Sequence, residues 1–155
     1  FFIIILMFIG AASGGTGGGI KINTLVVLIL ATIQTFRGGG QIHAFKRKIA
    51  GETVMRALAV VMSSLVVVLG VSLLLTISEG MLEEHFLEVL FEATSAFSTT
   101  GLSMGLTSEL SPVGKFIVTI TMFAGRLGPL TLAYALAQKK RSSKIGYAED
   151  HILIG

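Results

Sequence analysis

Residues 91–103 decide the fold and read Phe91-Glu92-Ala93-Thr94-Ser95-Ala96-Phe97-Ser98-Thr99-Thr100-Gly101-Leu102-Ser103. They close a helical pattern over residues 82–97, in which Glu84, Glu88 and Glu92 recur at every fourth residue on one face. Apolar side chains fill much of the rest of this segment, which is long enough to dip into a membrane. A short polar stretch around Gly101 follows. The sequence therefore predicts a re-entrant helix that ends at a polar stretch, as in a pore loop.

Apolar segments on both sides are long enough to cross a membrane. Residues 57–78 form an uncharged run close to the roughly 20 residues that a helix needs to span about 30 Å of hydrocarbon. Residues 116–138 form another, which is interrupted by Gly125-Arg126-Leu127-Gly128-Pro129 and should be broken or kinked there. A third crossing is split into apolar residues 1–9, a glycine-rich stretch over residues 10–19 and a helical stretch over residues 20–36.

The composition agrees with a membrane protein. Hydrophobic residues make up 52% of the chain and charged residues 14%, whereas ordinary soluble domains carry about 25% charged residues. The chain has no Cys, which excludes disulfides, thiolate metal sites and cysteine nucleophiles. A formal net charge of +3 is too small to indicate a nucleic-acid partner. We expect a single all-α membrane domain.

The placement of charges predicts the orientation, because short cytoplasmic loops collect Lys and Arg. Basic residues crowd the stretch between the first two crossings and the stretch after the last one, whereas residues 79–112 carry glutamates and no Lys or Arg. We therefore expect three crossings and an acidic connection on the outer side. The predicted segments are a broken transmembrane helix (1–40), a cytoplasmic basic loop (41–56), a complete helix–pore loop–helix repeat (57–138) and a cytoplasmic tail (139–155).

The Thr-Thr-Gly triplet after the re-entrant helix suits the selection of cations. The C-terminus of a helix carries partial negative charge, and an extended Thr99-Thr100-Gly101 can turn successive carbonyls toward an ion and replace its hydration shell. Gly101 allows a backbone conformation that other residues resist. The alternative is an ordinary outer turn with hydroxyl caps, but the re-entrant context favours a filter.

The glycine run over residues 14–19 reads Gly14-Gly15-Thr16-Gly17-Gly18-Gly19. It does not match a phosphate-binding loop, because Lys21 follows Ile20 and no Lys-Ser or Lys-Thr pair occurs. Close helix packing through GxxxG spacing is the alternative. The run holds more glycines than such packing requires, and they would prevent a helix. A flexible loop over residues 10–19, lying in a cavity, is therefore our interpretation.

Arg126 falls near the middle of the last predicted crossing, where a charge costs about 2.5 to 3.5 kcal/mol on insertion scales. The position is too central for easy snorkelling, so we expect the side chain to face protein or water, where loop carbonyls can accept hydrogen bonds from the guanidinium. Beneath a cation filter such a charge would act as a barrier.

Four segments together resemble the C-terminal part of the KtrB-like subunits in the Trk/Ktr/HKT superfamily of potassium transporters. They are Gly14-Gly15-Thr16-Gly17-Gly18-Gly19-Ile20-Lys21, residues 91–103, Gly125-Arg126-Leu127-Gly128-Pro129-Leu130-Thr131-Leu132 and Ile152-Leu153-Ile154-Gly155. The resemblance implies four helix–pore loop–helix repeats around one pore, of which this sequence would hold half of repeat three and all of repeat four. The apolar run over residues 1–9 likewise resembles the remainder of a truncated helix, so we expect this sequence to be the C-terminal piece of a longer chain.

The resemblance also implies functional roles. Ser98, Thr99, Thr100 and Gly101 would form one quarter of the selectivity filter, with K+ at Thr99 and Thr100. The loop would be the gate, with Arg126 facing it; its residues are Gly14, Gly15, Thr16, Gly17, Gly18 and Gly19. The subunit would be a homodimer in the bacterial cell membrane, resting on a cytoplasmic KtrA-like ring that binds nucleotide (ATP or ADP). Sodium is left open as a co-transported or a modulating ion.

Two other functions are kept as alternatives. The first is a secondary transporter for an anionic solute, in which Arg126 and the N-terminus of a broken helix clamp a carboxylate. The second is a membrane scaffold without transport, in which the glycines only pack helices. The Thr-Thr-Gly triplet and the acidic outer connection favour a cation over both. None of these functions is enzymatic.

Overall fold

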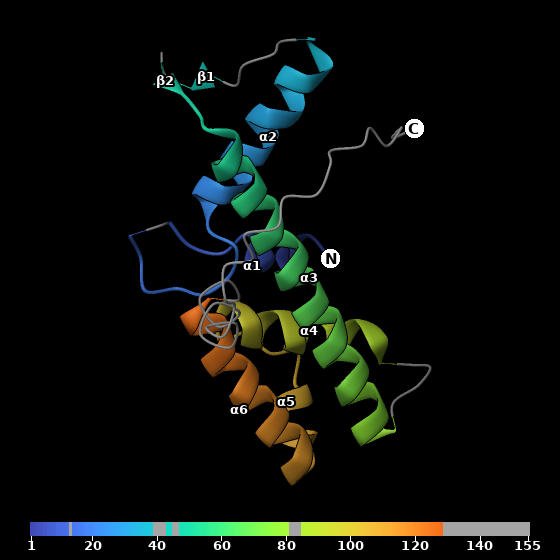
Figure 1. The fold of residues 1–155 in the computed structure, drawn as a ribbon. Helices are drawn as coiled ribbons and strands as arrows, with labels where there is room; N and C mark the ends of the chain where they lie inside the picture. The colour runs from blue at the N-terminus through green and yellow to red at the C-terminus, as the bar shows by residue number, and fades with distance from the viewer. Residues whose placement is uncertain (13, 39–42, 45–46, 81–84, 129–155) are drawn as a thin grey trace, which may run out of the picture.

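The computed structural model describes residues 1–12, 14–38, 43–44, 47–80 and 85–128. Within these residues the fold is helical apart from a two-residue antiparallel pairing, in which His43 lies opposite Lys48 and Ala44 opposite Arg47. The expected all-α class is confirmed (Figure 1). The elements are α1 (Phe2–Ile9), α2 (Ile22–Phe36), β1 (His43–Ala44), β2 (Arg47–Lys48), α3 (Gly51–Glu79), α4 (Phe86–Ser98), α5 (Leu106–Glu109) and α6 (Pro112–Leu127).

Among the described helices, α3 alone is long and apolar enough to cross a membrane. It contains the predicted span over residues 57–78 and ends at Gly80, whose left-handed conformation (φ 68°) stops the helix. The polar side chains within it are satisfied locally. Ser64, Ser72 and Thr76 each donate a hydroxyl hydrogen bond to the carbonyl four residues earlier, so the helix buries them without unpaired groups.

The first predicted crossing is broken where the sequence indicated. Helix α1 ends at Ile9, Gly10 takes a positive φ of 72°, and helix resumes only at Ile22. Figure 1 shows the intervening segment as a wide loop beside the helices. Hydrogen bonds join the two ends of this loop. The N–H groups of Ile20, Lys21 and Ile22 donate to the carbonyls of Phe8, Ile9 and Ala11, respectively.

Helix α4 packs against α1, α3 and α6 and lies across them at the centre of the molecule (Figure 1). Residues 91–98 are all buried. The core beside it is formed by Leu75, Val89, Ala93, Ala96, Leu106, Leu110 and Val118. A short helix enclosed on several sides fits the expected re-entrant helix. Glu92, one of the glutamates that recur at every fourth residue, is 5% exposed, and its carboxylate accepts hydrogen bonds from hydroxyl groups inside the fold.

The end of α3 and the start of α6 are joined by Glu79. Its carboxylate accepts hydrogen bonds from the Ser111 N–H (2.9 Å) and the Ser111 hydroxyl (2.6 Å), while the Ser111 Oγ accepts from the Gly114 N–H and caps α6. Helix α6 ends at Leu127, within the predicted break. The rest of that predicted crossing, the tail over residues 139–155 and part of the basic loop lie outside the described residues.

Candidate functional site

The C-terminus of α4 is closed by its own hydrogen bonds. The Thr99 N–H donates to the Ala96 carbonyl and the Thr100 N–H donates to the Ser95 carbonyl, both at 3.1 Å. Thr99 thereby takes a left-handed conformation with φ 55°, which is rare for a β-branched residue. The prediction of an extended Thr99-Thr100 is therefore wrong at Thr99, since the helix runs through Ser98 and Thr99 caps it.

A backbone conformation of this kind costs about 1 to 3 kcal/mol and persists where the surroundings enforce it, often at functional sites. At Thr99, hydrogen bonds of the neighbouring residues restrain the backbone. The Ser98 hydroxyl donates to the Thr94 carbonyl at 2.7 Å and lies 2.5 Å from the Thr100 Oγ1. The hydroxyl groups of Ser98 and Thr100 are thus held together at the end of the buried helix.

The glycine-rich loop reaches this helix end directly. The Gly18 N–H donates to the Ser98 carbonyl at 3.2 Å and to the Thr99 Oγ1 at 2.9 Å. These residues are about eighty positions apart in the chain, with a separation of 81 for Gly18 and Thr99. The loop therefore lies directly against the end of the helix that carries the predicted filter residues.

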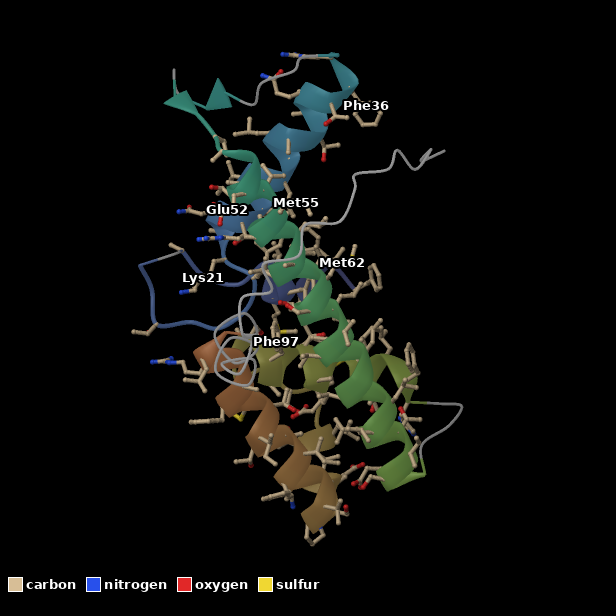
Figure 2. All side chains as sticks on the ribbon, in the orientation of Figure 1. Lys21, Phe36, Glu52, Met55, Met62 and Phe97 are labelled. Carbon is tan, nitrogen blue, oxygen red and sulfur yellow. The ribbon has the colours of Figure 1, made fainter. Side chains whose placement is uncertain are left out.

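Backbones approach unusually closely around the Phe97 carbonyl. A Cβ placed on Gly18 would lie 2.7 Å from the Phe97 carbonyl oxygen, and a Cβ on Gly125 would overlap the same oxygen. The Phe97 ring lies near the Phe8 ring, with 6.4 Å between centroids. Figure 2 shows Phe97 where the end of α4 lies beside α6. The loop, α4 and α6 thus meet at one backbone carbonyl.

The glycine run has two parts with different surroundings. Gly14, Gly15 and Thr16 are exposed, and a Cβ on Gly14 would meet no atom within 4 Å. Gly18 and Gly19 are buried, and Gly19 takes φ 87° against the backbone of Gly10. We therefore separate a loop tip (residues 14–16) from a packed loop base (residues 18–19). The base packs closely against the surrounding backbone, whereas the tip is exposed.

Arg126 follows Gly125 in the last turn of α6, so its backbone lies next to the loop base. Its side chain is exposed, and it makes no hydrogen bond or ion pair with any residue that the structure describes. The expected hydrogen bonds from the guanidinium to loop carbonyls are therefore not present among these residues. Arg126 stands as a fixed positive charge beside the loop.

A hollow of about 530 Å3 lies between α1, the loop and the end of α4. Its walls are apolar on the α1 side and polar at the residues predicted as filter; the lining includes Ile3, Leu6, Met7, Gly10, Ala11, Gly17, Ser98, Thr99, Thr100 and Leu102. In residues 1–12, 14–38, 43–44, 47–80 and 85–128, no group of three or more His, Cys, Asp or Glu side chains could hold a metal ion. A cation here would have to be held by hydroxyl and carbonyl oxygens, near the negative end of α4.

Two residues of this site have roles that the sequence analysis missed. Gly125 was interpreted only as a helix breaker, although a small residue at a helix contact is a known signal of close packing. Glu92 was assigned to an outer acidic face. Ser103 and Thr107 in the next segment gave a hint, since a carboxylate in a segment that enters the membrane needs hydroxyl or amide partners.

Comparison with known proteins defines the class. The chain matches the TrkH family model, described as cation transport protein, over residues 1–145. It therefore belongs to this family, which is one of transporters and not of enzymes, and the expected resemblance is confirmed.

Individual relatives narrow the assignment. The chain is 42% identical over 155 residues to the Ktr system potassium uptake protein D of Bacillus subtilis, covering 100% of this chain and 34% of the relative. It is 43% identical over 153 residues to the Ktr system potassium uptake protein B of Vibrio alginolyticus (99% and 33%), and 35% identical over 153 residues to the potassium/sodium uptake protein NtpJ of Enterococcus hirae (97% and 34%). The chain spans about a third of the length of these curated relatives.

Proposed function

We propose that this chain forms part of the ion pathway of a potassium uptake transporter of the Ktr type. The observation that carries the proposal is the pair of hydrogen bonds from the Gly18 N–H to the Ser98 carbonyl and the Thr99 hydroxyl, which joins the loop to the end of the buried helix. The names of the relatives support potassium as the ion.

The proposed selectivity filter consists of residues 98–101, with K+ held at Thr99 and Thr100. Partial negative charge at the C-terminus of α4 favours a cation there, and carbonyl oxygens replace water around it. Gly101 has φ 79°, and a Cβ on it would meet no atom within 4 Å, so its backbone conformation rather than its packing requires glycine. The NtpJ relative, a potassium/sodium uptake protein, favours sodium as a second ion.

The proposed topology is multi-pass in a bacterial cell membrane, with the C-terminus in the cytoplasm. Helix α3 supplies one complete crossing. Together with α4 and α6 it would form the fourth helix–pore loop–helix repeat, and α1 with α2 would form half of the third. The gate would be the glycine-rich loop, with Arg126 beside its base, lying below the filter; its residues are Gly14, Gly15, Thr16, Gly17, Gly18 and Gly19.

The proposed filter predicts a specific effect of Gly101→Ser. A left-handed backbone costs a residue with a Cβ about 1 to 2 kcal/mol, so the mutant segment should relax and the preference for K+ over Na+ should fall by about tenfold. Competition between the two ions for uptake by the full-length transporter measures this. Gly80→Ser is the matched control, because Gly80 also has a positive φ and open space but lies outside the filter. Unchanged discrimination in Gly101→Ser at normal abundance would refute the filter assignment.

We further propose that the transporter is a homodimer that rests on a cytoplasmic KtrA-like ring, which binds ATP or ADP; no nucleotide site is proposed on this chain. Two of the relatives are named as proteins of a Ktr system, which supports a multi-component assembly. The basic loop with Lys46, Arg47 and Lys48 and the tail with Lys139, Lys140, Arg141 and Lys144 offer positive charge for docking.

Reversal of the charges at Lys46, Arg47 and Lys48 is expected to weaken capture of the ring by about tenfold at low ionic strength. The loss should shrink as salt rises, because the Debye length falls from about 10 Å at 0.1 M to about 3 Å at 1 M. Lys115→Glu, at the opposite end of the proposed topology, is the control. Capture indifferent to these three changes would mean that the basic loop only orients the chain in the membrane.

A further inference from the structure

Glu92 is a carboxylate buried inside α4, with 5% of its surface exposed. Its Oε2 accepts a hydrogen bond from the Ser103 hydroxyl at 2.8 Å, and its Oε1 accepts one from the Thr107 hydroxyl. The two hydroxyl oxygens also lie 2.8 Å from each other. A buried charged group is tolerated only when it is well hydrogen-bonded. Glu92, Ser103 and Thr107 therefore form one closed polar cluster.

This cluster connects α4 to the segment that follows the proposed filter. Ser103 lies two residues after Gly101, and its Oγ also accepts a hydrogen bond from the Gly105 N–H at 3.1 Å. Thr107 lies in α5, which is anchored in the core by buried Leu106. The cluster thus fixes both ends of residues 103–107 to a single side chain of the buried helix.

Packing alone does not hold this segment. Residues 101–105 are exposed, and behind Gly101 and Leu102 lies a hollow of about 140 Å3, whose wall also includes Glu92, Ser95, Ala96, Thr107, Val118 and Met122. Neighbouring atoms therefore leave space around Gly101, and few packing contacts oppose a shift of its backbone. The hydrogen bond from Ser103 to Glu92 opposes such a shift.

We propose that Glu92 is a positioning residue for ion selection. It braces residues 101–107 against α4 from behind, so that the carbonyls of the filter keep a fixed distance from one another and from the helix end. This inference rests on the proposed function of residues 98–101 as a filter. A purely structural role, by contrast, would alter the amount of folded protein without altering which ion it prefers.

The test compares three variants of the full-length transporter. Glu92→Ala removes the brace and should lower the preference for K+ over Na+ in competitive uptake by about tenfold. Glu92→Gln should stay within about twofold of the wild type, since its amide can accept from one hydroxyl and donate to the other. Glu88→Ala is the matched control, because Glu88 lies one turn earlier on α4 and, within the part of the chain that the structure describes, its side chain bonds only to His85. Wild-type discrimination in Glu92→Ala at equal membrane abundance would overturn the proposal.

A second variant keeps the proposal testable if Glu92→Ala does not reach the membrane. Ser103→Ala leaves Glu92 paired with Thr107 and removes the bond next to the filter, together with the contacts of the Ser103 Oγ with the Gly105 N–H and the Thr107 hydroxyl. A loss of preference supports the brace and an unchanged preference overturns it. Hydrogen exchange over residues 101–107 should quicken in the alanine variants and not in Glu92→Gln, and unchanged exchange would also overturn it. If the wild-type transporter did not take up potassium, the proposed function would be refuted instead. The hydrogen-exchange measurements do not depend on potassium uptake, so the two failures can be distinguished.

Discussion

Gly125→Ala is expected to abolish uptake and to lower the thermal stability of the transporter markedly. The added methyl group would overlap the Phe97 carbonyl oxygen. This oxygen belongs to the backbone of α4 and cannot rotate away, as a flexible side chain could, so α6 must move as a body. Overpacking in a well-packed interior typically costs about 1 to 3 kcal/mol, and a backbone collision belongs at the upper end. Thermal unfolding of the purified full-length protein and potassium uptake in cells measure the two effects.

Gly70→Ala is the matched control for this prediction. Gly70 lies within α3, and a Cβ on it would meet no atom within 4 Å. Alanine in the interior of a helix is better than glycine by roughly 0.5 to 1 kcal/mol, so this variant should be neutral or slightly more stable. If Gly125→Ala unfolded at the wild-type temperature, α6 would not pack on the Phe97 carbonyl, and the loop, α4 and α6 would not share one contact.

Local patterns were sufficient to predict the elements of this fold. The long apolar run of α3, the break after Ile9 and the helix that ends near Ser98 each follow from periodicity and glycine content within one segment. The all-α class follows from them. The break in the last predicted crossing also follows from local chemistry, because Gly128-Pro129 cannot continue a helix.

The contacts within the site depend on residues far apart in the sequence, which periodicity does not reveal. Thr99 was expected to be extended, yet the hydrogen bonds of the helix end and the Gly18 N–H hold it in a left-handed conformation. The spacing placed Glu92 on one helix face with Glu84 and Glu88, but it could not reveal that Ser103 and Thr107 in the next segment donate hydrogen bonds to the Glu92 carboxylate.

The glycine run illustrates the same limit within a single motif. Gly14 and Gly18 are indistinguishable as residues, and both fit a flexible loop as well as a close contact. In the structure, Gly14 lies free whereas Gly18 contacts Phe97, Ser98 and Gly125. The distinction matters for any experiment on the proposed gate, because deletion at the base would break the contact with α4 while deletion at the tip leaves it intact.

Shortening the loop tip by deletion of Gly14 and Gly15 is therefore expected to raise potassium flux in the absence of the regulatory ring. The hydrogen bonds of Gly18, Ile20 and Lys21 anchor the base and should survive the deletion. Figure 2 shows Lys21 on the side from which the loop projects. Gly10, Ala11 and Gly17 line the hollow beside Ser98, Thr99 and Thr100. A shorter loop would obstruct the ion less, as the proposed gate requires. Flux that remained fully dependent on the ring would refute a gate at the tip.

Arg126→Ala should also raise potassium flux, because it removes a positive charge. An ion that passes within about 8 Å of a fixed positive charge, at an effective dielectric constant of about 20, meets a barrier of about 2 kcal/mol. Because Arg126 has no ion-pair partner among the described residues to offset its charge, its removal should raise basal flux by about tenfold or more. Arg56→Ala is the control, since Arg56 is paired with Glu52 on its own helix. A transporter that clamps an anionic solute with Arg126 would instead lose transport in this variant, so the sign of the change in flux separates a cation gate from an anion site.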